Sequence, residues 1–328
     1  MGSRLGRTLA GLIFGLLAAT CSRGQAWLPP EGEGWLTFGY GNLYSAHHYG
    51  VTIAPDAAPG VTRTQTLGIV AGYGITDRLA LNLSIPFVTS IYHGNAPHRD
   101  AFGNKLTPDD GFYHGVFQDF RINLGYQAVR GTVAVAPFAT VVIPSNDYPT
   151  LSHAAPGKGL NQVLLGFATG ASLDQLVPGT FAELYYDYAF VQKVVGINTN
   201  RSDFGLQAGY FITPSLGIRF LSAGWYTHGG IAYNRGRDFL TSTPPRPDLY
   251  LHHDQIAKAK MLNVGGGLSY VLSGSTEVSV SYLRSIYGIT DHKLDNGLGF
   301  SVSYSFSPQQ IIRQWFPPKE SRSAGEAP

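Results

Sequence analysis

Apolar residues that recur at every second position constrain the fold of this chain most strongly. The segment 79–87 (LALNLSIPF) carries leucine, isoleucine or phenylalanine at each odd position, and the segment 67–75 repeats this alternation. A helix would repeat its apolar residues every three or four positions instead. Three turn-forming residues, 76–78 (TDR), separate the two segments. The pattern therefore predicts an antiparallel β-hairpin with one apolar face.

The same alternation occurs twelve times along the chain. Each segment has the ~9–11 residues that a tilted strand needs to cross a bilayer. Pro137 interrupts one weak segment, which a bulge or a barrel rim would tolerate. The clear segments are 67–75, 79–87, 120–126, 184–190, 204–210, 262–270, 278–282 and 298–306, and the weaker ones are 35–45, 132–143, 162–172 and 216–227.

The connections between these segments alternate in length. Short turns lie at 76–78, 129–131, 173–179, 213–215 and 273–275, and long polar connections lie at 46–61, 88–115, 144–161, 193–202, 228–256 and 288–296. Short turns at one end and long loops at the other are typical of bacterial outer-membrane barrels, whereas a soluble sandwich or propeller does not segregate its connections in this way. The fold class expected is all-β: a transmembrane, antiparallel, up-and-down barrel of about 12 strands, with periplasmic termini and long extracellular loops.

The first 26 residues have the layout of a secretory signal peptide. Arg4 and Arg7 form a positively charged start, residues 9–19 (LAGLIFGLLAA) form an apolar core, and Ala26 ends a stretch with small residues at both recognition positions. The apolar core is too short to span ~30 Å of hydrocarbon as a helix. We expect a signal peptide at 1–26, a barrel at 27–306 and a periplasmic C-terminal tail at 307–328. An uncleaved anchor and lipidation at Cys21 are the alternatives.

Composition excludes several classes of function. Cleavage after Ala26 would remove Cys21, the single cysteine, and with it any disulfide or thiolate metal site. It would also take three arginines from the 23 basic residues, which leaves 20 against 21 acidic residues and a formal net charge of −1. The sequence has no stripe of basic residues that could bind nucleic acid. The expected partners are outer-membrane lipid and a small-molecule solute, with no cofactor and no nucleic acid, and the oligomeric state stays open.

Several local motifs occur together in the part of the chain after residue 26. They are 27–34 (WLPPEGEG), 73–78 (YGITDR), 109–111 (DDG), 118–119 (QD), 144–148 (PSNDY), 152–155 (SHAA), 200–202 (NRS) and 227–230 (THGG). As a set they resemble the outer-membrane transporter family labelled for the meta-pathway of phenol degradation. The resemblance covers most of the chain after residue 26. It implies a barrel that admits small, often aromatic or hydrophobic, compounds, and it implies no catalytic residues.

Charged residues in the strands occupy the phase opposite the apolar one, where they are candidates for a solute-selecting constriction. A charge facing hydrocarbon at mid-depth costs ~2–4 kcal/mol for arginine or lysine, so these side chains should face a lumen. A barrel of this size encloses a narrower interior than a sixteen-stranded porin. The side chains could form a selective eyelet or a salt-bridged network that braces or plugs the barrel. The candidates are Asp119, Arg121, Glu183, Asp187, Asp203 and Arg219.

All ten histidines fall in the long connections or at the strand ends that join them. Acidic residues accompany them, and imidazole together with carboxylate suits divalent transition metals. No pair of histidines has a dedicated metal-binding spacing, so a hydrogen-bonded lid of loops and a pH-sensitive gate are the alternatives. The extracellular-mouth candidates are His114, His153, His228, His252, His253 and Asp254, of which His153, His252 and His253 are the candidate metal ligands.

Enzymatic signatures are weak in this sequence. Outer-membrane acyl hydrolases place a histidine and a serine two residues apart on one strand, and none of the histidines here is followed by serine at that spacing. We therefore do not expect an enzyme. The leading hypothesis is a passive channel for small organic solutes. The first alternative is a closed barrel whose loops bind metal or a partner, and the second is an outer-membrane hydrolase.

Overall fold

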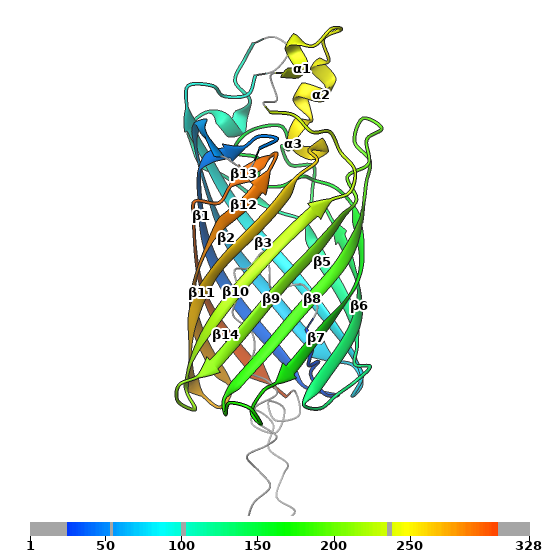
Figure 1. Cartoon of the computed structure of the whole chain (residues 1–328), viewed down its shortest axis with the longest axis vertical. Coiled ribbons are helices and arrows are strands. Elements are labelled where there is room, and N and C mark those ends of the chain that lie inside the picture. The colour runs from blue at the N-terminus through cyan, green and yellow to red at the C-terminus, as the bar shows by residue number, and fades with distance from the viewer. Residues whose placement is uncertain (1–24, 53–54, 100–102, 235–237, 308–328) are drawn as a thin grey trace, which may run out of the picture.

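The structure, a computed structural model, describes residues 25–52, 55–99, 103–234 and 238–307. Within them twelve antiparallel strands form one closed barrel, because β14 pairs with β1 along its whole length (Figure 1). The strands are β1 (Gly34–Tyr49), β2 (Pro55–Gly74), β3 (Leu79–Gly94), β5 (Phe120–Tyr126), β6 (Val133–Ile143), β7 (Gln162–Ser172), β8 (Thr180–Val191), β9 (Arg201–Phe211), β10 (Leu216–Thr227), β11 (Lys260–Ser273), β12 (Thr276–Ile289) and β14 (Asn296–Phe306). Strands adjacent in sequence are adjacent in the barrel, which confirms the predicted up-and-down topology.

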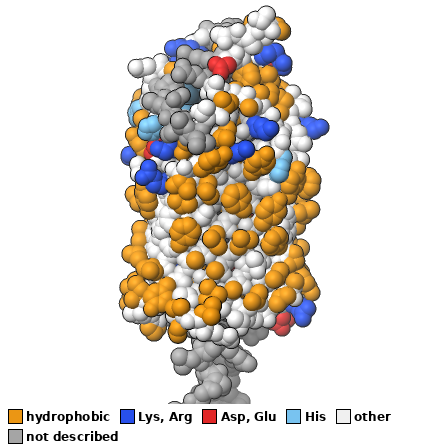
Figure 2. Space-filling view, in the orientation of Figure 1, with side chains coloured by type: hydrophobic (Ala, Val, Ile, Leu, Met, Phe, Trp, Pro, Cys, Tyr) orange, Lys and Arg blue, Asp and Glu red, His pale blue; other side chains and the backbone are white. Residues whose placement is uncertain are grey.

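The alternating apolar residues face outward and the intervening residues face inward. Leu67, Leu165 and Phe300 are each more than half exposed, while Asn82 and Asn123, from the opposite phase, are almost completely buried. In the space-filling view, hydrophobic side chains cover the wall of the barrel, and most of the visible lysine and arginine side chains lie toward the extracellular end (Figure 2). An apolar outer belt on a closed sheet is what a bilayer requires, because closure satisfies every backbone hydrogen bond of the wall. The chain is therefore a bacterial outer-membrane β-barrel.

The predicted short turns lie at one end of the barrel and the predicted long connections at the other. At the short-turn end, β11 and β12 are joined by residues 274–275 alone. At the opposite end, β10 and β11 are joined by residues 228–259, which contain α1 (Asp238–Thr241), α2 (Pro247–Leu251) and α3 (His253–Ile256). Gly34 of β1 pairs with Phe306 of β14, so the first and last strands meet at the short-turn end.

Two predicted long connections are wrong in detail. The segments 46–61 and 288–296 are mostly β-structure, because β1 continues to Tyr49, β2 starts at Pro55, and the short strand β13 (Asp291–Lys293) pairs with β1. The connection after β3 likewise contains η3 (Thr107–Asp109) and the strand β4 (His114–Phe117), which pairs with β3. Strands thus extend beyond the apolar belt, where backbone pairing continues without a lipid-facing pattern in the sequence.

Residues that precede β1 fold into the periplasmic end of the barrel. The backbone N–H of Leu28 donates to Gln127 Oε1 at 2.7 Å, and the Leu28 side chain packs against Ala80 and Ala136. The indole N–H of Trp27 donates to the Gly131 carbonyl at 3.1 Å. Most of the expected signal peptide and tail lie outside the described residues, so the 1–26 and 307–328 assignments stay predictions. No helix in the described part of the chain is long and apolar enough to span a membrane.

Candidate functional site

Charged side chains lie inside the barrel in two layers, the first in its periplasmic half. Arg219 is the fourth residue of β10 and Glu183 the fourth of β8, counted from the periplasmic turns. Arg219 Nη2 donates to Glu277 Oε1 at 2.6 Å, and both side chains are buried. Glu183 Oε1 accepts a hydrogen bond from the backbone N–H of Ala26 at 2.6 Å. This layer therefore holds one ion pair and one carboxylate tied to the segment before β1.

The second layer lies nearer the extracellular end. Asp187 of β8 and Asp203 of β9 are directly opposed in register, and both are completely buried. Arg201 Nε donates to the two carboxylate oxygens of Asp203 at 3.0 and 3.1 Å, and Arg201 Nη2 donates to Gln162 Oε1 at 2.8 Å. The layer thus combines two neighbouring carboxylates with one guanidinium.

Asp119 and Arg121 lie at the extracellular end of β5. The Tyr148 hydroxyl, from the connection between β6 and β7, donates to Asp119 Oδ1 at 2.5 Å, and the backbone N–H of Gly159 donates to the Tyr148 oxygen at 2.9 Å. Burial, followed by the hydrogen bond to Asp119, raises the pKa of Tyr148, so this phenol remains a donor. Asp119 therefore anchors a loop. A role of the six predicted lumen residues in solute selection stays a prediction.

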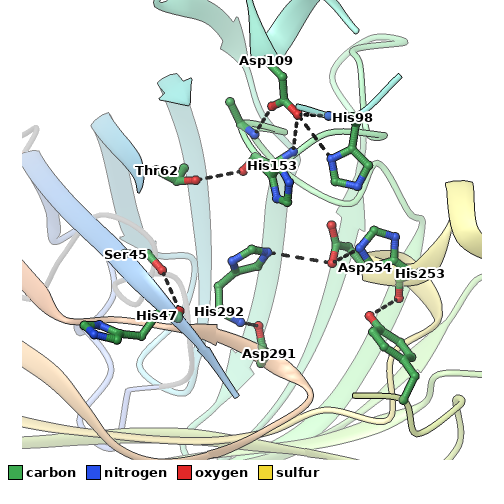
Figure 3. Close-up of polar contacts among 12 residues, drawn as sticks. Ser45, His47, Thr62, His98, Asp109, His153, His253, Asp254, Asp291 and His292 are labelled. Carbon is green, nitrogen blue, oxygen red and sulfur yellow. Dashed lines mark hydrogen bonds and ion pairs between the residues drawn. The ribbon is translucent and has the colours of Figure 1, made fainter. Parts of the chain in front are cut away.

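Four histidines from separate parts of the chain converge over the extracellular mouth (Figure 3). His98 follows β3, His153 lies between β6 and β7, His253 starts α3, and His292 belongs to β13. The ring centroid of His98 lies 4.2 Å from that of His153 and 5.1 Å from that of His253. The ring centroids of His153 and His292 are 6.1 Å apart. His48 stands edge-on to His292 at 4.9 Å. The cluster therefore joins connections from around the barrel.

Asp109, the last residue of η3, fixes two of these connections. Its Oδ2 accepts the backbone N–H groups of His98 and His153 at 2.8 and 3.2 Å and lies 3.3 Å from His98 Nδ1, while its Oδ1 accepts the N–H of Ala154 at 3.0 Å. Burial acts to raise the pKa of Asp109, but the hydrogen bonds from His98 and Ala154 outweigh it and lower that pKa. Asp109 is thus an ionised carboxylate that holds the post-β3 connection against residues 152–154.

Asp254 lies beside the histidines on α3. Its Oδ1 is 3.4 Å from His253 Nε2 and 3.9 Å from His292 Nε2. Burial acts to raise the pKa of Asp254, but the histidines, His253 first, outweigh it and hold that pKa well below its usual range. Burial, followed by the charges of His98 and His292, lowers the pKa of His153 to about 4. At neutral pH the mouth therefore holds an anionic carboxylate beside a neutral His153.

The structure brings together only half of the six predicted mouth residues: His153, His253 and Asp254. His252 turns away, and its Nδ1 hydrogen-bonds Gln255 Oε1 at 2.7 Å. His114 Nε2 pairs with Asp110 Oδ1 at 2.8 Å, apart from the cluster.

His228 also lies away from the cluster, on the outward phase of the rim. Its Nε2 is 2.8 Å from Ser202 Oγ, and the Tyr186 hydroxyl lies 2.8 Å from the same oxygen. Ser202 belongs to β9 and His228 directly follows β10. Sequence reasoning considered a histidine and a serine on the same strand, so it could not find this pair. In the described residues no hydrogen-bond partner orients His228 Nδ1, which a nucleophile–base pair would ordinarily need.

Sequence reasoning missed His98, His292 and Asp109 as members of the mouth cluster. His98 and His253 are 155 residues apart, and no local spacing relates them. Their shared location in long connections was the only available signal. Sequence reasoning also missed Glu277 and Arg201, which are the ion-pair partners of Arg219 and Asp203. Glu277 and Arg201 lie at strand ends, outside the segments with clear alternation.

The fold and the polar interior define a bacterial outer-membrane β-barrel with a charged lumen. No protein-family model matches the chain, and no curated protein sequence matches it. Among solved structures, an outer membrane channel from Pseudomonas putida F1 is similar, with a TM-score of 0.60 and 14% identity over 88% of this chain and 98% of that one. At this identity the similarity shows the fold.

Two further solved structures are more distant. The NanC porin has a TM-score of 0.45 and 10% identity over 83% of this chain and 98% of that one. The CymD monoaromatic hydrocarbon channel has a TM-score of 0.40 and 12% identity over 85% of this chain and 89% of that one. Neither similarity carries an argument about the function of this chain.

Proposed function

We propose that this protein is an outer-membrane channel through which a small organic solute diffuses passively. The observation that carries the proposal is the charged inward phase of the closed barrel, where Asp187, Asp203 and Arg219 occupy positions facing away from lipid. Charges inside a protein cost free energy unless they are paired or hydrated. A barrel that served only as an anchor could fill its interior with apolar side chains at lower cost, so an interior of charged side chains held in pairs such as Arg201–Asp203 and Arg219–Glu277 favours a polar path for solute.

Charges at the extracellular mouth support the same proposal. Lys158, in the connection between β6 and β7, has an exposed side chain whose charge interacts with those of Asp203, Asp254 and Asp291. The mouth therefore presents charged groups of both signs to a solute. A solute entering from outside would meet the His/Asp cluster first and the Asp187–Asp203 layer next.

The class of solute rests on the sequence motifs. Their resemblance to the transporter family labelled for phenol degradation favours a small aromatic or hydrophobic compound. Aromatic rings are frequent at the mouth. The buried Tyr92 stacks on His153 at 4.6 Å, and Tyr250, which stacks on His253 at 5.8 Å, is partly exposed and could contact such a cargo. Planar rings offer stacking surface without a fixed hydrogen-bond pattern.

Liposome swelling tests the proposal directly. The mature protein, refolded into liposomes, should admit neutral polyols and aromatic ammonium compounds of increasing size at rates that fall steeply with solute diameter. Swelling rates equal to those of protein-free liposomes for every solute would reject a channel. Aromatic ammonium compounds are preferable to uncharged phenols here, because the charge keeps the background leak through lipid low and has the sign that the lumen is expected to prefer.

A hydrolase is the second candidate, favoured only by the Ser202–His228 hydrogen bond on the outer rim. Hydrolysis of short-chain esters or phospholipids by the wild type, abolished in Ser202→Ala, would establish it. We expect no activity above that of Ser202→Ala, because in the described residues His228 lacks the carboxylate or amide that would orient it.

A further inference from the structure

We propose that His98, His253 and Asp254 bind a divalent transition-metal ion in the extracellular mouth. One ring nitrogen of each histidine and one carboxylate oxygen of Asp254 lie within 4.8 Å of one another. Two imidazoles with one carboxylate are typical ligands of zinc and its neighbours, whereas calcium and magnesium prefer all-oxygen sites. The site is independent of the proposed channel function, since it would bind metal whether or not the lumen conducts.

Hydrogen bonds fix which nitrogen of each histidine is available. His253 Nδ1 lies 2.6 Å from the Tyr250 carbonyl, which can only accept, so Nδ1 carries the hydrogen. His98 Nδ1 faces the ionised carboxylate of Asp109 at 3.3 Å and carries its hydrogen for the same reason. Nε2 of both histidines is thereby left with a lone pair. Metal-binding histidines almost always donate their second ring N–H to a carbonyl or carboxylate in this manner.

His253 and Asp254 can bind the same ion. His253 Nε2 and Asp254 Oδ1 are 3.4 Å apart, a separation that two ligand atoms of one metal ion have. His98 supplies a ring nitrogen within 4.8 Å of both ligand atoms.

Asp109 is the orienting carboxylate of this site and not a ligand. It also groups with His98 and His153 at ligand distances. Its two oxygens, however, already accept three backbone N–H groups besides facing His98 Nδ1. Coordination would give up those hydrogen bonds. His292 Nε2, at 3.9 Å from Asp254 Oδ1, could supply a fourth ligand.

Small movements of the connections would complete the coordination. Tetrahedral zinc holds its ligand atoms about 3.3–3.6 Å apart, which follows from bond lengths of about 2.0–2.2 Å. The ligand atoms here lie within 4.8 Å of one another, so they must approach by roughly 1 Å. His253 and Asp254 lie on a four-residue helix in a long connection, where such a shift does not disturb the barrel wall.

The position of the site gives it a structural consequence. His98 follows β3, and His253 and Asp254 lie in the connection that leads from β10 to β11. In the ring of twelve strands, β3 and β10 are six strands apart. The ligands therefore come from opposite walls of the barrel. A bound ion would link the two connections across the mouth and narrow the entrance.

Zinc titration of the refolded mature protein tests the site. By competition with a chromophoric chelator, the wild type should bind one zinc ion per chain. His253→Ala and Asp254→Asn should each weaken binding at least about tenfold, and Asp109→Asn should weaken it by about 10- to 100-fold, as expected when a group that orients a ligand is lost. His252→Ala and His114→Ala are the matched controls, because they remove histidines of the same loops that lie outside the site.

Two results would overturn the proposal. One is the absence of a saturable site in the wild type. The other is equal loss of affinity in His252→Ala and His253→Ala, with every variant shown to be folded by its heat-modifiable migration on gels. Zinc X-ray absorption on the wild type keeps the test independent of variant folding: at least two imidazole ligands support the site, and a purely oxygen shell rejects it.

Discussion

Arg219 and Glu277 form a buried ion pair that reaches across strand β11. Arg219 Nη2 lies 2.6 Å from Glu277 Oε1, and the two residues belong to β10 and β12. The register partner of Arg219 on the intervening strand is Gly267, in the run Gly265–Gly266–Gly267. A Cβ on Gly267 would lie 2.7 Å from the Val280 carbonyl oxygen of β12, so the glycine permits β11 and β12 to approach closely beside this pair.

Breaking this pair on one side should destabilise the barrel. Arg219→Met leaves the Glu277 carboxylate buried and uncompensated, and loss of one partner from a buried pair typically costs about 3–5 kcal/mol. The double variant Arg219→Met/Glu277→Gln should be the more stable of the two. Urea unfolding of the barrel in detergent measures both, and additive losses in the double variant would show that the two side chains are not coupled.

An arginine in the outward phase should be costly at mid-membrane. Phe300 lies in the middle of β14 with half of its surface exposed. Phe300→Arg is expected to destabilise the barrel folded in bilayers by ~2–4 kcal/mol, because a charge then faces hydrocarbon. Phe112→Arg, in an exposed extracellular connection, is the control and should change little. Equal effects of the two substitutions would contradict the membrane boundary described above.

Asp187 should favour cations in the lumen. Its carboxylate lies opposite that of Asp203, which Arg201 already pairs. Asp187→Asn removes one negative charge without separating the Arg201–Asp203 pair, so the preference for K⁺ over Cl⁻ should fall. The reversal potential in a KCl gradient reports this ratio. Asp110→Asn, in the connection outside the lumen, should leave the potential unchanged.

Asp295 should make the extracellular end of the barrel sensitive to acid. Its carboxylate accepts hydrogen bonds from Lys293 Nζ at 2.7 Å and from the N–H of Ala46 at 2.8 Å. Burial acts to raise the pKa of Asp295, but these hydrogen bonds and that of His47 outweigh it and hold the pKa below its ordinary value of 3.8.

Because the folded-state pKa is depressed, the stabilisation by Asp295 is fully present above pH 3.8 and is lost as the pH falls through the lower folded value. The protection factors of residues 44–46 against hydrogen exchange should therefore fall below about pH 4 in the wild type. In Asp295→Asn they should already be low at neutral pH and change less on acidification. Identical pH profiles for the two proteins would assign the acid sensitivity to another group.

The barrel wall was predictable because each membrane strand carries its own signal. In β3, the leucines at 79, 81 and 83 face lipid, so one short segment reveals both strand and orientation. The strands β4 and β13 carry no such signal, since they are only four and three residues long, too short for an alternating pattern to show.

The mouth cluster was not predictable, because its geometry depends on connections that only the closed barrel brings together. His98 and His253 meet by spanning the ring, and neither residue differs locally from His252 or His114. Adjacent histidines take opposite roles at 252 and 253: His252 contacts Gln255, while His253 faces Asp254. The first turn of α3 decides this, and the residue types alone do not.

Single-channel recording tests the central claim most directly. The mature protein reconstituted into a planar bilayer should produce discrete conductance steps in KCl, smaller than those of sixteen-stranded porins because the interior is narrower and crowded by charged side chains. Insertion of folded barrels with no conductance at any voltage would contradict a channel.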